Sequence, residues 1–325
     1  MHLLQRPRLL RATPAIRSLV QETHLRVNDF IVPLFVVTGK QVKEEISTMP
    51  GYYRLSLDNL AAEVKQLWNL GLKAILLFAK CPDALKDNKG TEAVNPNGLM
   101  QQSIKAVKDA CPDMYVLTDV ALDPYSSYGH DGIVENGEIA NDATVEVLAQ
   151  MSVSHAQAGA NMVAPSDMMD GRIGAIRLAL EQNNFTQTGI MAYSAKYASS
   201  FYGPFREALD SAPGFGDKKT YQMNYANRHE ALREVQLDIA EGADIVMVKP
   251  ALSYLDVIRE VKNMSSVPVT AYNISGEYAM IKAAAKQGWL DEDKAILETL
   301  TSIKRAGADI IATYFAKDAA RLLHG

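Results

Sequence analysis

The sequence has little cysteine, no long apolar run and no excess of positive charge. Its two cysteines, Cys81 and Cys111, are too few for a disulfide framework or a four-thiolate zinc site. No stretch approaches the roughly 20 apolar residues that a membrane span requires. A formal net charge of −5 argues against a nucleic-acid surface, which needs a clustered basic face. These absences predict a reduced, cytoplasmic protein that binds neither membranes nor nucleic acid.

The composition is typical of an enzyme with a full core. A hydrophobic share of 48% is ample for burial, so nothing here indicates disorder. A chain of 325 residues accommodates either two medium domains or one large α/β barrel. The order of the apolar segments has to decide between these two architectures.

Residues 1–29 form a distinct start, with five arginines against Glu22 and Asp29. A transit peptide is also Arg-rich, but it is Ser-rich and poor in acids, and a secretory signal needs an apolar run after its charged start. The apolar side chains of this segment need somewhere to be buried. We therefore predict an arm that docks on a partner subunit through Leu9, Leu10, Ile16 and Leu19.

Short apolar runs alternate with amphipathic helical stretches along the rest of the chain, and each run is long enough for a buried parallel strand. Three junctions repeat a Gly-Ala-Asn or Gly-Ala-Asp sequence, in which glycine is expected to end a helix in the left-handed conformation. The eight runs are Phe30–Val37, Ala74–Ala79, Tyr115–Leu122, Asn161–Pro165, Gly189–Tyr193, Asp244–Val248, Val267–Tyr272 and Asp309–Phe315.

Eight strand-then-helix units are the number that a (β/α)8 barrel needs. A doubly wound sheet would need a dinucleotide or phosphate fingerprint after an early strand, and the sequence has neither a GxGxxG nor a Walker A motif. No linker rich in Pro, Gly or Ser divides the chain. We therefore predict an N-terminal arm over residues 1–29 and a single TIM-barrel catalytic domain over residues 30–325.

The polar residues that follow the predicted strands are candidates for the site, because barrel chemistry lies where strands end and βα loops begin. Lysines follow two neighbouring strands, so both are expected to face the same end of the barrel. In chain order the candidates are Thr118, Asp119, Ser166, Asp167, Lys196, Lys249, Tyr272, Ser275 and Tyr314.

The two lysines suggest amine chemistry. A lysine attacks a ketone only as the neutral amine, although its ordinary pKa is about 10.4. An apolar wall and a second cation both lower that pKa, and the Met-Val-Lys-Pro sequence places Lys249 against such a wall. A single lysine of this kind more often binds an anion or pairs with an acid such as Asp119. Two adjacent lysines favour Schiff-base chemistry.

The segment after Lys196 is rich in aromatic residues, glycine and proline. Residues 197–206 and 213–219 carry Arg206, Lys218 and Lys219. This composition fits a mobile lid that brings cations to a carboxylate, and it equally fits an ordinary surface loop with aromatics tucked beneath it.

Four long motifs resemble porphobilinogen synthase (5-aminolevulinate dehydratase). They are residues 191–208 around Lys196, 243–256 around Lys249, 271–285 around Ser275 and 302–316 around Tyr314. The resemblance extends over essentially the whole chain and implies an α/β barrel with an N-terminal arm, assembled as a homo-octamer. It also implies the condensation of two 5-aminolevulinate molecules to porphobilinogen with loss of two waters, an early step of haem and chlorophyll synthesis.

The same resemblance implies a role for each matching residue. Lys249 matches the lysine that holds the first substrate as a Schiff base, and Lys196 matches the one that engages the second. Ser275 and Tyr314 match the hydroxyls that bind the first substrate's carboxylate. The other matches concern the second substrate: Arg206 and Gln222 at its carboxylate, with Lys218 where many relatives have arginine, and Asp119 and Ser166 near its amine.

The main departure from the resemblance lies in the loop after the third strand. Zinc-dependent members carry three cysteines where this chain has Ala121, Asp123 and Asp131. Carboxylates favour Mg²⁺ or no tight metal, so we expect the magnesium-responsive branch and no zinc. The two aspartates either hold a metal or only bind substrate amines or water.

A separate, allosteric Mg²⁺ site is implied at Glu234, outside the active site. This cation is expected to activate by stabilising the assembly. Without the resemblance, Glu234 would be interpreted as part of a solvated helix face.

Two other functions compete with this one. A class I aldolase on the same barrel needs one Schiff-base lysine and usually has phosphate-binding glycines near strands seven and eight, which this chain lacks. A non-catalytic, metabolite-binding subunit would leave the two lysines unexplained.

Overall fold

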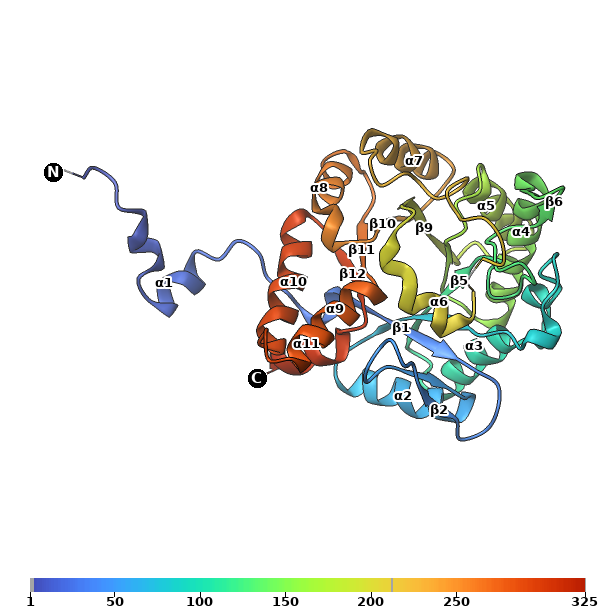
Figure 1. The fold of residues 1–325 in the computed structure, drawn as a ribbon, viewed down its shortest axis with the longest axis horizontal. Coiled ribbons are helices and arrows are strands. Elements are labelled where there is room, and N and C mark those ends of the chain that lie inside the picture. Colours follow the sequence, from blue (N-terminus) through green and yellow to red (C-terminus); the bar gives the residue numbers. More distant parts are fainter. Residues whose placement is uncertain (1–2, 212, 325) are drawn as a thin grey trace.

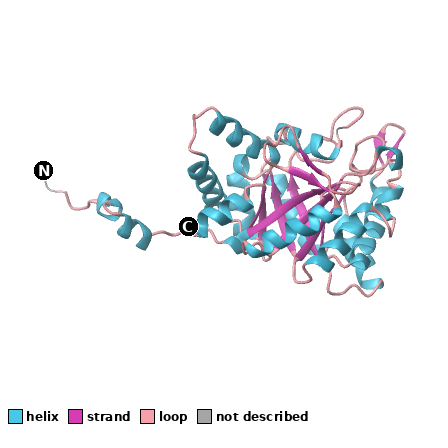
Figure 2. Cartoon of the chain, turned by 90° about the horizontal axis from the view of Figure 1, so that it is seen from below, coloured by secondary structure: helices cyan, strands magenta, loops and turns pink. Residues whose placement is uncertain are grey.

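The computed structural model describes residues 3–211 and 213–324, and its centre is a closed parallel barrel. Each strand pairs with the next, and the last pairs back with the first through Phe30 and Ile311. Figure 2 shows the strands enclosed by helices. The predicted (β/α)8 barrel is thus confirmed. Its strands are β1 (Phe30–Val36), β4 (Ala74–Ala79), β5 (Tyr115–Val120), β8 (Met162–Pro165), β9 (Gly189–Lys196), β10 (Ile245–Lys249), β11 (Val269–Asn273) and β12 (Ile310–Thr313).

Amphipathic helices cover the outside of the barrel. In α2, for example, Leu60, Val64 and Leu67 recur at helical spacing and are fully buried. The α-helices that follow the arm are α2 (Leu57–Asn69), α3 (Leu99–Ala110), α4 (Asn141–Ala158), α5 (Arg172–Gln182), α6 (Gly203–Leu209), α7 (His229–Ala240), α8 (Leu255–Met264), α9 (Ser275–Lys286), α10 (Glu292–Ala306) and α11 (Ala316–His324).

Shorter elements lie outside the barrel strands and the α-helices. Two antiparallel pairs lie outside the eight barrel strands: β2 (Lys43–Glu45) with β3 (Tyr53–Leu55), and β6 (Val134–Glu135) with β7 (Glu138–Ile139). The 3-10 turns are η1 (Pro7–Arg11), η2 (Val27–Asp29), η3 (Asp83–Leu85), η4 (Thr91–Val94), η5 (Ser200–Tyr202) and η6 (Leu252–Tyr254).

Glycine ends three of the helices in the way that the repeated junctions predict. Gly159, Gly242 and Gly307 follow the ends of α4, α7 and α10 with φ of 105°, 106° and 123°. A side chain is strained in this conformation, which explains glycine at all three positions. The chain then enters the next strand within a few residues.

Strand β9 contains a bulge that matters for the site. Ala192 pairs with Val246 and Ala195 with Val248, so β9 has one residue more than β10 in this interval. An extra residue reverses the alternation of side chains between the two faces of a strand. Tyr193 and Lys196 can therefore both point into the barrel, although they are three positions apart and would face opposite sides of a regular strand.

The N-terminal arm extends away from the barrel (Figure 1). It contains η1 and the short helix α1 (Pro14–Leu19). Its apolar side chains contact little within the chain, since Leu9, Leu10 and Leu19 are 66%, 54% and 80% exposed. The arm is thus an apolar segment that the barrel of its own chain leaves uncovered. No helix within the described residues is both long and apolar enough to cross a membrane.

Candidate active site

Lys196 and Lys249 lie side by side at the C-terminal ends of β9 and β10, a region that we call the barrel mouth. The two residues are direct partners in the register of these strands. Both side chains are buried, with 6% and 4% exposure. The structure therefore brings the two predicted lysines together at one end of the barrel.

Lys249 lies in a cage of aromatic rings. Its Nζ is 5.1 Å from the ring centroids of Tyr193 and Tyr202, 4.9 Å from that of Phe205 and 4.8 Å from that of Tyr272. Burial and then the neighbouring charge of Lys196 lower the pKa of Lys249, against the opposing effect of the nearby carboxylates, to about 7. Near neutral pH, a large fraction of this amine is therefore unprotonated and can act as a nucleophile.

Lys196 has a polar environment instead. Its ammonium donates a hydrogen bond to the backbone carbonyl of Ser166 and lies 3.5 Å from Oδ2 of Asp131. Ser166 follows β8, so the bond joins two neighbouring strand ends. Lys196 is therefore surrounded by hydrogen-bond acceptors, although it lies only one strand away from the aromatic cage around Lys249.

Lys218 holds together the two aspartates of the loop after β5. Its Nζ is 2.8 Å from Asp131 Oδ1 and 3.3 Å from Asp123 Oδ2. Burial alone would raise the pKa of Asp131, but Lys196 and Lys218 together lower it to about 2. The pKa of Asp123 is raised by burial and by Asp131, while Lys218 opposes this shift.

This arrangement bears on the expected metal site at Asp123 and Asp131. The two carboxylates do approach one another around a cation, but that cation is an ammonium group. Within residues 3–211 and 213–324, no cluster of three or more His, Cys, Asp or Glu side chains could hold a metal ion. The lysine already supplies the positive charge that a metal would bring.

Asp119 lies at the end of β5 within the field of both lysines. Burial and then the charge of Asp123 raise its pKa, against the opposing charges of Lys196 and Lys249, to about 7. Its Oδ1 is buried and has no hydrogen-bond partner among the described residues. A buried, unpaired carboxylate oxygen is costly unless something binds it, which makes Asp119 a candidate binding group.

Residues 199–209, here called the lid, cover the mouth with η5 and α6. The hydroxyl of Tyr202 donates to the carbonyl of Lys249 over 3.3 Å. Arg206 and Gln222 line the same small cavity as both lysines, and Gln222 Nε2 is 3.5 Å from Asp131 Oδ2. This cavity measures only about 20 Å³, which is room for about one water molecule. Substrate entry therefore requires the lid or its neighbours to move.

The loop that carries Phe215, Lys218 and Tyr221 closes the polar side of the mouth. His130 contacts the Tyr221 hydroxyl through Nδ1 over 3.0 Å and the Phe215 carbonyl through Nε2 over 3.1 Å. A carbonyl only accepts, so Nε2 carries the proton and Nδ1 accepts from Tyr221. The Tyr221 oxygen in turn accepts from the Asp131 backbone N–H over 3.3 Å. This chain of bonds fixes the loop that carries Lys218.

The two predicted hydroxyl groups lie on the aromatic side. Ser275 is fully buried at the start of α9, and its Oγ accepts a hydrogen bond from the Phe205 backbone N–H over 3.0 Å. The Tyr314 hydroxyl lies 3.0 Å from that of Tyr272. Each of the two hydroxyls can still make another hydrogen bond.

The four aromatic rings that surround Lys249 could not be recognised from the sequence as parts of one cage. All lie within or next to the quoted motifs, so composition offered a weak signal. Their convergence depends on the β9 bulge and on the lid folding back over the mouth. Tyr272 was expected as a strand-end residue but not as part of a cage, and the other three rings belong to Tyr193, Tyr202 and Phe205.

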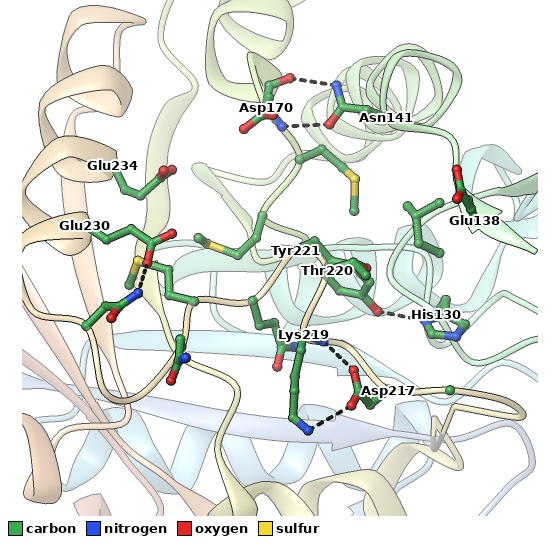
Figure 3. Close-up of a pocket in the computed structure, with 18 of the residues that line it drawn as sticks. His130, Glu138, Asn141, Asp170, Asp217, Lys219, Thr220, Tyr221, Glu230 and Glu234 are labelled. Atoms are coloured by element: carbon green, nitrogen blue, oxygen red, sulfur yellow. Dashed lines mark hydrogen bonds and ion pairs between the residues drawn. The ribbon is translucent and has the colours of Figure 1, made fainter.

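Glu234 lies outside the active site, half-buried on α7, beside a cavity of about 870 Å³. Figure 3 shows Glu230 and Glu234 directed toward this cavity from one side, with Asp170 on another. The pKa of Glu234 is raised by burial first, and then by the charges of Asp238, Asp170 and Glu230. One wall of the cavity thus carries two neighbouring carboxylates, those of Glu230 and Glu234.

Comparisons with known proteins give one consistent result. The profile of the delta-aminolevulinic acid dehydratase family matches residues 4–322. The protein of that name from Halalkalibacterium halodurans is 54% identical over 98% of this chain and 97% of its own length. The chloroplastic one from Physcomitrium patens is 58% identical over 98% of this chain and 74% of its own length. The crystal structure of delta-aminolevulinic acid dehydratase (porphobilinogen synthase) from Toxoplasma gondii ME49, in complex with the reaction product porphobilinogen, has a TM-score of 0.97 at 51% identity and covers 98% of this chain and 91% of that chain.

Proposed function

This chain belongs to the delta-aminolevulinic acid dehydratase family, and from that premise we infer that it condenses two molecules of 5-aminolevulinate into porphobilinogen with loss of two waters. It is a lyase of tetrapyrrole synthesis, the route to haem and chlorophyll. The observation that carries the mechanism is the pair of buried lysines in register at the barrel mouth, one of them caged by aromatic rings.

Lys249 is the residue that we propose forms a Schiff base with the first substrate. Its neutral amine attacks the ketone carbon, a C–N bond forms, and the hydroxyl of the resulting carbinolamine leaves as water. Its pKa of about 7 supports this role, because the nucleophile must be unprotonated. Ser275 and Tyr314 lie on the same side of the mouth and would donate their hydroxyl hydrogens to the substrate carboxylate.

The polar side of the mouth would take the second substrate. Lys196 engages its ketone, and the unpaired oxygen of Asp119, together with Ser166, binds its amine. The cations near its carboxylate are Arg206 and Lys218, with Gln222 as a further donor. Lys218 already contacts both aspartates of the loop, so it would have to share its charge between them and the substrate.

A single assay separates this function from its competitors. The purified protein is incubated with 5-aminolevulinate as the only substrate, and a pyrrole product is detected by Ehrlich colour. We expect colour that grows with time and enzyme concentration. A class I aldolase or a non-catalytic binding subunit would give none.

We propose that Mg²⁺ acts at Glu234 and not in the active site. Glu234, Glu230 and Asp170 line a wide cavity without converging into a three-carboxylate cluster, so Glu234 could hold a hard cation that retains most of its waters. The cation would neutralise this acidic wall and stabilise the assembly. The loop after β5 does not fit, because Lys218 lies between its carboxylates. No zinc is expected, because the loop offers no thiolate ligand.

The magnesium proposal is tested with Glu234→Ala, with Glu298→Ala as a matched control on another helix. Glu234→Ala is expected to lose magnesium stimulation and to keep basal turnover, while the control responds like the wild type. A full magnesium response in Glu234→Ala, or an essential stoichiometric zinc in the wild type, would count against the assignment.

We propose that the arm serves subunit contacts and that the assembly is a homo-octamer. The exposure of Leu9, Leu10 and Leu19 supports this, since apolar side chains on a projecting segment need a partner surface. Deleting residues 1–29 should reduce the oligomer and the activity together, measured by light scattering and by the pyrrole assay. A truncated protein of full size and full activity would contradict it.

We also propose that the protein works in the cytoplasm. Cys81 and Cys111 are buried and unpaired, which fits a reducing compartment. Cell fractionation with an antibody against the protein tests this, and recovery from an organelle or an envelope fraction would contradict it.

A further inference from the structure

The first turn of α9 contacts both the lid and the loop that follows Lys249. Ser275 Oγ accepts from the Phe205 backbone N–H over 3.0 Å. Glu277 accepts from the backbone N–H of Leu252 over 2.8 Å and from that of Ile274 over 3.0 Å. One helical turn therefore joins the lid, which covers the amine of Lys249, to the loop that follows Lys249 in the chain.

Gly276 is the point of closest approach in this contact. A Cβ added to it would lie 2.9 Å from both the carbonyl carbon and the Cα of Phe201, and closer still to the Phe201 carbonyl oxygen. These are backbone atoms of the lid, so no side-chain rotation can relieve the clash. Gly276 has an ordinary helical conformation within α9, so lack of space, and not its backbone angle, excludes a side chain here.

The lid has a second anchor at its other end. Arg54, which is buried on β3, donates to the carbonyl of Ala208 over 2.7 Å and to that of Glu207 over 2.6 Å. These carbonyls belong to the last turn of α6, which otherwise leaves them without partners. The lid is therefore fixed at its start by α9 and at its end by β3.

We propose that Gly276 is a positioning residue for the condensation, because the missing side chain lets the lid rest on α9 and hold Tyr202 and Phe205 against Lys249. This inference rests on the proposed function of Lys249. If the lid cannot rest on α9, the two rings withdraw and water reaches the amine. Water favours the protonated form, so less of the nucleophile is available at neutral pH.

The pH dependence of Lys249 involves every charged or titratable group that faces it. The elements packed around it contribute both signs of charge, and most of these groups stay in place when only the lid moves. They are Lys196 and Tyr193 on β9, Asp119 on β5, Asp123 and Asp131 in the following loop, Tyr272 on β11, Tyr202 and Arg206 on the lid, and Lys218 in the opposite loop.

The test compares Gly276→Ala with Gly203→Ala in the full-length protein. Gly203 belongs to the lid itself, and a Cβ there would meet nothing within 4 Å, so it is a matched control. We measure hydrogen exchange of the lid amides without substrate, pyrrole formation from pH 6 to pH 10, and thermal unfolding. Alanine is the better helix former, so Gly276→Ala should not weaken α9 itself.

We expect three results for Gly276→Ala: faster exchange in the lid, turnover at pH 7 lower by about 100-fold, and partial recovery as the pH is raised. Gly203→Ala should match the wild type in all three. Wild-type exchange and pH profile in Gly276→Ala would overturn the proposal, as would a loss of turnover that is equal at every pH.

A second variant keeps the test decisive if Gly276→Ala does not fold. Arg54→Lys releases the other end of the lid and should produce the same upward shift of the pH profile, whereas an unshifted profile would overturn the proposal. The two hypotheses also fail differently. A wild-type protein that makes no pyrrole would refute the proposed function, while the exchange comparison would still decide whether Gly276 holds the lid.

Discussion

The two sides of the barrel mouth place the same functional group in opposite surroundings. On the aromatic side, four rings surround the amine of Lys249. On the polar side, Lys196 contacts a carbonyl oxygen and a carboxylate. The two lysines are nevertheless partners in adjacent strands. The comparison shows that the neighbours, and not the position in the barrel, determine what a strand-end lysine can do.

The polar side also balances its charges locally. Asp123 and Asp131 are buried, and Lys218 lies within reach of both. Asp119 is the exception, since one of its oxygens has no partner among the described residues. We infer that the aromatic side prepares a nucleophile by excluding water, whereas the polar side prepares charged contacts for a second molecule.

Replacing Lys249 should abolish the function of the aromatic side. Lys249→Ala is expected to lower turnover by at least about 10⁴-fold, because among the described residues only Lys249 places its amine between all four rings. It should also abolish the adduct that borohydride traps with 5-aminolevulinate or with its unreactive analogue levulinate. Peptide mapping of the wild type checks this, and labelling confined to other lysines would contradict it.

Removing Lys196 should separate the two sides. Lys196→Ala is expected to abolish pyrrole formation, with a loss of about 10³-fold or more, and to leave trapping at Lys249 intact. Lys196 also helps to lower the pKa of Lys249, so trapping in the variant should need a slightly higher pH. If Lys196→Ala lost trapping at every pH, the two lysines would not have separate roles.

Removing Lys218 should weaken the polar side alone. Lys218→Met leaves two buried carboxylates without their cation, which is expected to cost about 3–5 kcal/mol of unfolding free energy at pH 7. The pKa of Asp131 is lowered in the folded state, so its contribution is present above pH 4 and is lost as the pH falls toward 2. Urea unfolding should show the difference between wild type and variant shrinking between pH 4 and pH 2. A constant difference would argue against this pairing.

Much of the fold could be predicted because its signal is local. Each barrel strand is an apolar run, and the run Ala74–Ala79 coincides with strand β4. The short hairpins, such as β6 with β7, have too few residues to show a period. Their pairing joins residues within loops, where the sequence shows no regular apolar pattern.

The candidate site was predictable only as far as strand ends determine it. Lys196 and Lys249 follow directly from their strands. The cage does not, because the orientation of Tyr193 depends on a bulge and Phe205 comes from the lid. The contact between Lys218 and Asp131 joins residues 87 positions apart, which no local pattern reveals. The sequence therefore left open whether the two aspartates hold a metal or bind amines and water, and it gave no sign of the lysine that the structure places between them.

The central claim is that exclusion of water lowers the pKa of Lys249. The most direct measurement is the pH dependence of borohydride trapping with levulinate in the wild type, with the label located by peptide mapping. The account predicts labelling of Lys249 that is half-maximal near pH 7. Labelling that keeps rising toward pH 10, as for an ordinary lysine with a pKa of about 10.4, would contradict it.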